Sequence, residues 1–311
     1  MITKLYRKIT PVAFRKFIYR LFLGKILQRT RMIKQHKLAK EIVAYYNLPE
    51  NRNNYPQEYI EAAKWIELHG FAMFPYDYTS EYKQRQPQVF NCQESKLKYI
   101  LHQGKKLYFP KNFSNKDCQR YYNELTMEQD PRSPHQYNYS CFKQGNEWII
   151  LDVGTAEGIF ALSVIDYAEK IYLFECDERW LEALSMTFKP FQDKIEIVHK
   201  YVSDTDTEST ITINTFLSDK TFQKCYLKMD IEGAELLALT GGDAFLNDSK
   251  KMNISVCAYH LDEIGEQINA YLTARGFNCV YTNGVMTFGT EAPYFRKGVI
   301  YAQNFSENVD A

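Results

Sequence analysis

The chain of 311 residues is 45% hydrophobic and 15% aromatic, which is ample for a packed core in one large domain with extensions or in two small domains. It has seven cysteines, none at CxxC spacing, so neither a disulfide framework nor a zinc site is expected, and the thiols should be free in a reducing cytosol. No apolar stretch reaches the roughly 18–20 residues that span a bilayer, and no cleavable secretory signal is expected.

A basic arm precedes an acidic body. Residues 1–40 contain twelve Lys/Arg and no Asp/Glu, which leaves 26 basic against 38 acidic residues in the rest of the chain. Residues 1–46 are predicted to form an amphipathic helical arm. Phe14, Ile18 and Phe22 recur there at helical spacing among basic residues. Such a helix either rests on an anionic membrane or packs its apolar side on the protein. Nucleic acid is not expected as a partner, because no binding motif accompanies the charge.

Residues 47–145 are predicted to form a cap region rich in tyrosine and phenylalanine. It should contain a helix over Pro56–Gly70, two short strands within Lys98–Pro110 and a helix over Asp117–Asp130. The segment PRSPHQYNY that follows contains two prolines and His135, so it cannot be helical throughout. We expect this region to cover the strand ends of the next domain and to supply aromatic faces that stack on a sugar.

In residues 146–311 strands alternate with helices. Seven strands are expected: EWIILDVG, IYLFECD, KIEIVHKYVSD, CYLKMD, NISVCAYH, FNCVYTN and GVIYAQN. They lack a regular polar alternation, so helices should cover both faces of the sheet. The last two have no helical pattern between them and should form a hairpin, which makes the final strand antiparallel. The predicted fold class is α/β, a doubly wound and mostly parallel seven-stranded Rossmann-like sheet with an N-terminal helical and aromatic cap.

A glycine-containing turn follows the first of these strands. In LDVGTAEG, Asp152 ends the strand, and Gly154 and Gly158 stand in the turn that opens a helix. Glycines are needed where the backbone approaches a ligand closely, although they also serve tight turns. NAD enzymes prefer GxGxxG here, whereas this loop is acidic, with Glu157 inside it. A carboxylate repels a pyrophosphate and attracts a sulfonium, which favours S-adenosylmethionine as the cofactor. Thr155 is also expected to contact the cofactor, together with Asp152, Gly154, Glu157 and Gly158 of the same loop.

The ends of the next two strands supply further candidates for cofactor binding. Glu175 ends the second strand, 21 residues after Gly154, where an acid can accept both hydroxyls of a ribose. Cys176 follows it directly. Ser203 and Asp204 end the third strand, where contact with an adenine is expected. For Asp204 an ordinary solvated turn is the alternative.

Three acidic residues stand within six positions where the strand CYLKMD ends: Asp230, Glu232 and Glu235. Ligands of open α/β sheets lie outside the carboxyl ends of the strands, so Asp230 should face the same cleft as Asp152. A buried carboxylate is costly without a partner, which favours a functional role for Asp230 in binding the cofactor and in catalysis. Glu232 and Glu235 begin the next helix, where negative charge suits the helix dipole. Capping therefore explains both, and a functional role for Glu235 stays open.

The stretches DVGTAEG, FECD and KMDIEGAE together resemble the FkbM-type S-adenosylmethionine-dependent methyltransferases of class I. The resemblance spans about residues 146–303, and with YFP and EQDPRSPHQY it extends back to about Leu107. Asn214 departs from the family, which often has Asp there, so an acidic role at that position is in doubt. The resemblance implies methyl transfer from S-adenosylmethionine to a hydroxyl, commonly on a sugar or a polyketide-like acceptor.

Transfer to an alcohol benefits from a general base. His260 ends the strand after the one that bears Asp230, so it should lie above the same cleft, and its ordinary pKa of about 6.5 suits a base. A packed and satisfied histidine is the alternative. His135, in its proline-flanked loop, is the second candidate. A divalent metal held by Asp230 and neighbouring acids could lower the pKa of the hydroxyl instead, but no ligand spacing requires it, so no metal ligand is assigned.

These patterns predict an O-methyltransferase of polysaccharide biosynthesis that acts on a sugar, in a glycan or linked to a lipid. It should be cytoplasmic and, where residues 1–40 bind lipid, peripheral to the inner face of the cell membrane. Two alternatives are an NAD-dependent sugar-modifying enzyme and a catalytically silent membrane-associated scaffold. The acidic glycine loop disfavours the first, and the intact Asp152, Gly154, Glu175 and Asp230 disfavour the second. Transfer to nitrogen stays open beside transfer to oxygen.

Overall fold

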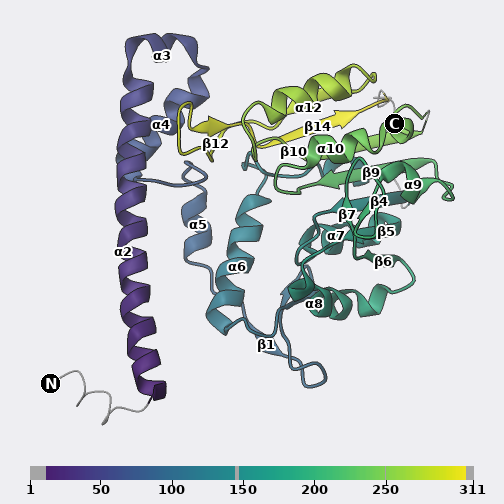
Figure 1. The fold of residues 1–311 in the computed structure, drawn as a ribbon, viewed down its shortest axis with the longest axis horizontal. Coiled ribbons are helices and arrows are strands. Elements are labelled where there is room, and N and C mark those ends of the chain that lie inside the picture. The colour runs from purple at the N-terminus through teal and green to yellow at the C-terminus, as the bar shows by residue number, and fades with distance from the viewer. Residues whose placement is uncertain (1–11, 144–146, 249, 306–311) are drawn as a thin grey trace. The chain divides into compact units, whose positions relative to one another are not determined.

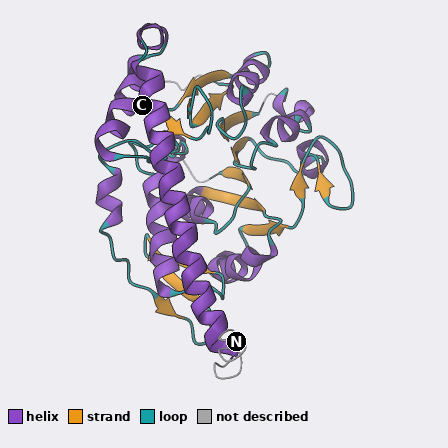
Figure 2. Cartoon of the chain, turned by 60° about the vertical axis from the view of Figure 1, so that its left-hand side comes forward, coloured by secondary structure: helices purple, strands orange, loops and turns teal. Residues whose placement is uncertain are grey.

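The computed structural model of the chain comprises two compact units. The first consists of the described residues up to Pro75 together with Gly289–Tyr294, and the second of Tyr76–Phe288 and the residues from Phe295 onward. Figure 2 shows that helices dominate the first unit, whereas strands and helices are mixed in the second. The domain limits expected at residues 46 and 145 stay a prediction. The structure describes residues 12–143, 147–248 and 250–305, with side chains from residue 29 onward.

The first unit is a long helix packed on two shorter ones. These helices are α2 (Val12–Asn47), α3 (Pro49–Asn54) and α4 (Gln57–His69). The C-terminal part of α2 buries Ile42 and Tyr46, and α4, which contacts α2, buries Ile60 and Ile66. A helix over most of the expected arm is thus confirmed, whereas residues 1–11 lie outside the described residues. The apolar positions named for the arm precede residue 29, outside the described side chains, so its amphipathic character stays a prediction. None of the described helices combines the length and the apolar character needed to traverse a bilayer.

A seven-stranded sheet forms the centre of the second unit. Its strand order is β6–β5–β4–β9–β10–β14–β11. The five strands from β6 to β10 are parallel, and β14 runs antiparallel to both of its neighbours, β10 and β11. The predicted α/β class with an antiparallel last strand is therefore confirmed. The strands are β4 (Trp148–Val153), β5 (Ala168–Phe174), β6 (Ile195–Val198), β9 (Lys224–Met229), β10 (Lys251–Cys257), β11 (Asn278–Tyr281) and β14 (Val299–Gln303).

The hairpin expected from the last two strands is present, but its connection is longer than a turn. Along the chain, two short strands, β12 (Met286–Thr287) and β13 (Phe295–Arg296), come between β11 and β14. They pair with each other. The third predicted strand is also divided, into β6 and the short β7 (Tyr201–Val202), which pairs with β8 (Thr210–Ile211).

Helices cover the sheet, as the uninterrupted apolar strands require. Every residue of β4 is buried, and α12 packs on β14 and β11 while α10 packs on α12 (Figure 1). The helices after β4 are α7 (Ile159–Val164), α8 (Glu178–Phe188), α9 (Ile213–Leu217), α10 (Glu235–Thr240), α11 (Asp243–Leu246) and α12 (Ile264–Thr273). Asn214, the departure from the family pattern, accepts a hydrogen bond from the backbone of Phe245 at 2.9 Å, so it joins α9 to α11.

The part of the second unit that precedes β4 is a small sheet and two helices. The sheet contains β1 (Phe90–Asn91), β2 (Lys98–His102) and β3 (Lys105–Phe109), and the helices are α5 (Thr79–Lys83) and α6 (Asn115–Glu128). α6 begins at Ser114, whose side chain accepts a hydrogen bond from the backbone of Asp117 in a capping box. The tyrosine-rich loop that follows α6 leads into β4 and carries His135.

Two turns at the carboxyl ends of β4 and β9 are in direct backbone contact. Gly154 has a φ of +80°, and a Cβ atom at this position would lie 1.9 Å from the carbonyl oxygen of Asp230. The backbone N–H of Asp230 donates to the carbonyl of Val153 at 3.0 Å. Glycine is therefore needed here because two backbones meet, and the glycine turn and the Asp230 turn hold each other in place.

Candidate active site

A cavity of about 460 Å³ opens at the carboxyl ends of the central strands. Its size lies within the range of roughly 300–1,000 Å³ that small-molecule sites occupy. Five of the residues expected to bind the cofactor line it: Gly154, Glu175, Cys176, Ser203 and Asp230. The other charged residues in its lining are Asp177, Glu232 and Lys200. With four carboxylates and one lysine, the cavity has a negative balance that favours a positively charged ligand.

Glu175 is held by two backbone groups. Its two carboxylate oxygens accept hydrogen bonds from the N–H groups of Ala156 and Asp177, both at 2.6 Å. These bonds fix the carboxylate between the glycine turn and the start of α8. Each oxygen keeps a second lone pair, so the group can still accept hydrogen bonds from two hydroxyls of a ligand in the cavity.

Asp152 does not face the cavity. It is fully buried, and its Oδ1 lies 3.1 Å from the Nζ of Lys228, which occupies the same level of the adjacent strand β9. Burial alone would lower the pKa of Lys228, but the charge of Asp152 outweighs it and the pKa is raised. Lys228 also donates to the carbonyl of Gly154 at 2.5 Å. The pair therefore joins two strands beneath the glycine turn, and the negative balance of the cavity comes from other carboxylates.

Four more of the expected cofactor residues do not line the cavity. Thr155 is buried and its hydroxyl donates to the carbonyl of Asp152 at 2.8 Å. Glu157 is also buried, and burial raises its pKa to about 7. Gly158 has a φ of +83° at the start of α7, and Asp204 is exposed beside Ser203. A role of these residues in binding the cofactor stays a prediction.

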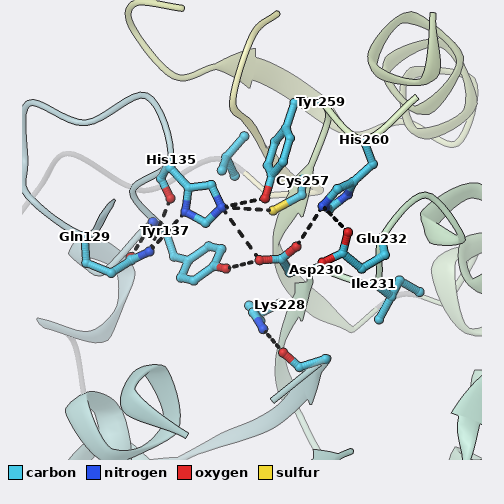
Figure 3. Close-up of polar contacts among 12 residues, drawn as sticks. Gln129, His135, Tyr137, Lys228, Asp230, Ile231, Glu232, Cys257, Tyr259 and His260 are labelled. Atoms are coloured by element: carbon cyan, nitrogen blue, oxygen red, sulfur yellow. Dashed lines mark hydrogen bonds and ion pairs between the residues drawn. The ribbon is translucent and has the colours of Figure 1, made fainter. Parts of the chain in front are cut away.

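The three residues expected to take part in catalysis meet at the carboxylate of Asp230 (Figure 3). Its Oδ1 lies 3.3 Å from the Nε2 of His260, and its Oδ2 lies 3.7 Å from the Nε2 of His135. The hydroxyl of Tyr137 donates to Oδ2 at 2.9 Å. Of this group, only Asp230 lines the cavity. Asp230 is therefore the member placed to touch a bound ligand, with the two histidines behind it.

The pKa values of the two histidines shift in opposite directions. Burial lowers the pKa of His135, so its ring is neutral at pH 7. Burial also opposes the charge of His260, but its hydrogen bond to Glu235 and the nearby Asp230 outweigh that effect and raise its pKa. Burial likewise works to raise the pKa of Asp230, yet the charges of neighbouring groups, including Lys228, lower it overall. The site thus has an ionised carboxylate between rings whose pKa values move in opposite directions.

Glu235 fixes both His260 and the turn that carries Asp230. Its side chain is fully buried, and its Oε1 lies 2.8 Å from the Nδ1 of His260. The same oxygen accepts hydrogen bonds from the backbone N–H groups of Ile231 at 3.0 Å and Gly233 at 3.3 Å. The sequence left a choice between capping and function for this residue. In the structure it caps the turn and orients the histidine at once.

Glu128 ends α6 near this centre and has a strongly raised pKa. Burial, followed by the charges of Asp230, Glu157 and Glu124, raises the pKa of the half-buried Glu128 from 4.5 to about 8. The folded protein therefore holds a proton here between pH 4.5 and 8 that the unfolded chain releases. Stability due to this group is full below pH 4.5 and is lost as the pH rises through 8.

Replacement of Glu128 by glutamine should remove this pH dependence, because glutamine resembles the protonated acid. We expect Glu128→Gln to match the wild type in melting temperature at pH 5 and to exceed it at pH 8.5. Glu182→Gln, at an exposed position of α8, is the control and should show no such difference. Thermal melts of the three proteins at both pH values measure it. Equal melting temperatures of Glu128→Gln and wild type at pH 8.5 would contradict the raised pKa.

Among the described residues, two groups of side chains place ligand atoms close enough together for a metal ion. They are His135, Asp230 and Cys257, and Asp230, Glu235 and His260, with the atoms of each group within 4.8 Å of one another. Each of these atoms already has a polar protein partner: for example, the Nε2 of His135 lies 3.0 Å from the hydroxyl of Tyr259. We assign no metal to either group.

The sequence did not single out four residues of this centre: Lys228, Tyr137, Cys257 and Tyr259. A lysine inside the apolar run CYLKMD was a usable signal, because a buried cation needs a partner and Asp152 stands on a neighbouring strand. Tyr137 follows His135 by two residues, but loop geometry alone brings its hydroxyl to Asp230. Cys257 and Tyr259 belong to an apolar strand end, where nothing in the sequence separates them from core residues.

The chain is similar to known proteins in sequence and in structure. A family model described as the methyltransferase FkbM domain matches residues 108–279, more than half of the 311 residues. None of the curated proteins matches the sequence.

Similar solved structures have sequence identities of 12–16%. The pre-rRNA processing protein fibrillarin of Methanococcus jannaschii has 13% identity and a TM-score of 0.39, over 71% of this chain and 98% of that chain. Fibrillarin of Aeropyrum pernix, with natively bound S-adenosyl-L-methionine, has 12% identity and a TM-score of 0.36, over 71% and 84%. An rRNA methylase from Streptococcus thermophilus has 12% identity and a TM-score of 0.34, over 51% and 87%.

Proposed function

Since the chain belongs to the FkbM methyltransferase family and is an S-adenosylmethionine-dependent methyltransferase, we propose that it methylates a hydroxyl group of a sugar, in a glycan or in a glycolipid. The observation that carries this proposal is the ionised Asp230 at the edge of a cavity with a negative balance, backed by two histidines. Family membership disfavours the NAD-dependent alternative, and the ionised Asp230 in the cavity lining disfavours a catalytically silent scaffold.

The cavity suits the expected cofactor in size and in charge. S-adenosylmethionine supplies a methyl group on a positively charged sulfonium. The fixed carboxylate of Glu175 is placed to accept the ribose hydroxyls, and the negative balance of the lining favours the cation. These features support a contribution of Glu175 and Asp230 to cofactor binding.

Asp230 is proposed as the residue that holds the acceptor hydroxyl and takes its proton. An alcohol oxygen becomes strongly acidic as it gains a carbon substituent, so a carboxylate whose pKa is below its ordinary value still accepts the proton at that stage. Exact placement of the reacting oxygen supplies much of the rate in such transfers. The hydrogen bond from Tyr137 and the contact with His260 keep the carboxylate in one orientation.

His260 and His135 act as positioning residues in this proposal. His260 is fixed by Glu235 and stabilises the ionised form of Asp230 on the Oδ1 side. The neutral His135 lies on the Oδ2 side. The sequence suggested His260 as the base itself. Its raised pKa and its place behind Asp230 favour the positioning role instead.

The test is methyl transfer from labelled S-adenosylmethionine to a panel of cell-envelope saccharides and lipid-linked sugars. The panel should include matched amines, because transfer to nitrogen is the competing outcome. Label on a sugar hydroxyl, located by fragmentation of the product, is the expected result. Label on an amine, or on none of the saccharides while the cofactor binds normally, would contradict the proposal.

A location in the cytoplasm, at the inner face of the membrane, is part of the same proposal. The support is the charge of residues 1–40, with twelve basic and no acidic residues. Lipid-linked acceptors in the panel are therefore offered in vesicles with and without anionic phospholipid. Sedimentation of the protein with the anionic vesicles alone is expected, and equal sedimentation with both would remove the membrane from the proposal.

A further inference from the structure

A second cavity, of about 590 Å³, lies on the second unit between α5, the segment after it, and α6. We call it the α6 groove. None of its lining residues lines the cofactor cavity. It is lined by Tyr82, Lys83, Arg85, Gln86, Lys116, Gln119, Arg120, Asn123, Glu124 and Met127. The residues from α6 recur at intervals of three or four, so they form one face of the helix over about 16 Å.

The groove has a positive balance, unlike the cofactor cavity. Four basic residues line it against the single acid Glu124. Arg120 has only long contacts with carboxylates, at 3.6–3.7 Å. Within the described part of the chain, Lys83, Arg85 and Lys116 form no ion pair. This concentration of cations stands out in a protein that carries 26 basic against 38 acidic residues after residue 40.

Hydrogen bonds hold the wall of the groove opposite α6. The side-chain amide of Gln119 donates to the carbonyl of Pro87 at 3.0 Å, and that of Asn123 donates to the carbonyl of Arg85 at 2.9 Å. The guanidinium of Arg85 stacks on the ring of Tyr82, 3.7 Å from its centre. The groove is thus formed by fixed segments, and an arginine and an aromatic ring lie together in it.

The residues that follow the groove along α6 are near the catalytic centre. Met127 lines its end on α6, and the next residue, Glu128, is close enough to Asp230 for their charges to interact. Gln129 follows, and its side-chain amide lies 3.4 Å from the Nδ1 of His135. One helix therefore carries the groove on its side and contacts the Asp230 centre at its end.

We propose that the α6 groove binds acidic sugar residues of the acceptor, so that the acceptor is an anionic oligosaccharide that lies along α6 with its reacting sugar at Asp230. This inference rests on the proposed function and names the class of its substrate. Arginine and lysine bind carboxylates by charge-assisted hydrogen bonds, and the four cations of the groove can contact acidic groups spaced along a chain of sugars. RNA is the other polyanion that fits a positive groove. The acidic balance of the protein after residue 40 disfavours it.

The test compares binding of three short probes to the full chain by calorimetry: an oligogalacturonate, a neutral maltooligosaccharide of equal length and an RNA oligonucleotide of equal charge. The variant Lys116→Gln with Arg120→Gln removes two cations of the groove. Lys64→Gln with Lys251→Gln removes two exposed cations elsewhere and is the matched control. We expect the oligogalacturonate to bind most tightly, and the groove variant to weaken it about tenfold. The control should weaken it less than twofold, and S-adenosylmethionine affinity should not change in either variant.

Three outcomes would overturn the inference: equal affinity for the neutral and the acidic saccharide, tighter binding of the RNA, or equal losses in the groove and control variants. The proposed function is tested separately, by methyl transfer. Transfer to neutral sugars that the groove variant leaves unchanged removes the groove's role and keeps the function. Binding of acidic saccharides in the groove without transfer to any sugar contradicts the proposed function and keeps the role of the groove in binding.

Discussion

Replacement of Asp230 by asparagine is expected to reduce methyl transfer by about 100-fold or more while the protein stays folded. Asparagine has nearly the same shape, so it can keep one hydrogen bond with Tyr137, but it removes the charge that faces His260 and His135. It also takes one of four carboxylates from the cavity lining, so the affinity for the positively charged cofactor should fall as well.

The measurements for Asp230→Asn are the turnover number at saturating cofactor and the dissociation constant of S-adenosylmethionine by calorimetry, the second of which needs no acceptor. Asp219→Asn removes an exposed carboxylate remote from the cavity lining and serves as the control for net charge. Wild-type turnover in Asp230→Asn would show that this carboxylate neither holds the acceptor nor takes its proton. A loss of the same size in Asp219→Asn would point to a general effect of charge.

Gly154→Ala is expected to have the second large effect, on stability and on cofactor affinity together. Alanine at a φ of +80° is strained, and its Cβ would lie 1.9 Å from the carbonyl oxygen of Asp230, a backbone atom that cannot rotate away. Strain and overpacking each cost about 1–3 kcal/mol, so a loss of about 3 kcal/mol is expected. This corresponds to a fall in melting temperature of roughly 6–12 °C. The turn must also shift, which should weaken cofactor binding at least tenfold.

Gly276→Ala provides a matched control for Gly154→Ala. Gly276 has nearly the same backbone conformation, with a φ of +83°, but no atom lies within 4 Å of the position that its Cβ would take. Its replacement should cost only the conformational strain, about 1 kcal/mol, and leave cofactor affinity unchanged. Thermal melts and calorimetry on both variants separate the cost of the backbone strain from the cost of the contact with Asp230. Equal melting temperatures would show that the contact with Asp230 relaxes without cost.

The α/β fold could be predicted from the sequence because buried parallel strands leave a strong signal. The runs around Trp148–Val153 and Lys224–Met229 are mostly apolar, and the helices α7 and α10 follow them. The insertion of β12 and β13 into the last hairpin could not be predicted, because each has only two residues and their pairing depends on contacts distant in sequence.

The meeting of His135, Asp230 and His260 was foreseen in part. Asp230 and His260 follow adjacent strands of a parallel sheet, so topology alone brings them to one edge. His135 comes from a loop before the first strand, whose path depends on packing that no local pattern encodes. The environment of Asp152 was not foreseen. Its charge suggested a ligand contact, whereas its level on β4 places it opposite Lys228 on β9.

The backbone contact between Gly154 and Asp230 has a consequence for how this enzyme can change its substrate. Donor-side and acceptor-side groups share one rigid frame, so neither can be moved to suit a new molecule without disturbing the other. New acceptors would have to be accommodated by the region before β4, above all by the exposed basic residues of α6 that line the groove. Exchange of that helix face between related enzymes should therefore transfer acceptor preference and leave the reaction chemistry intact.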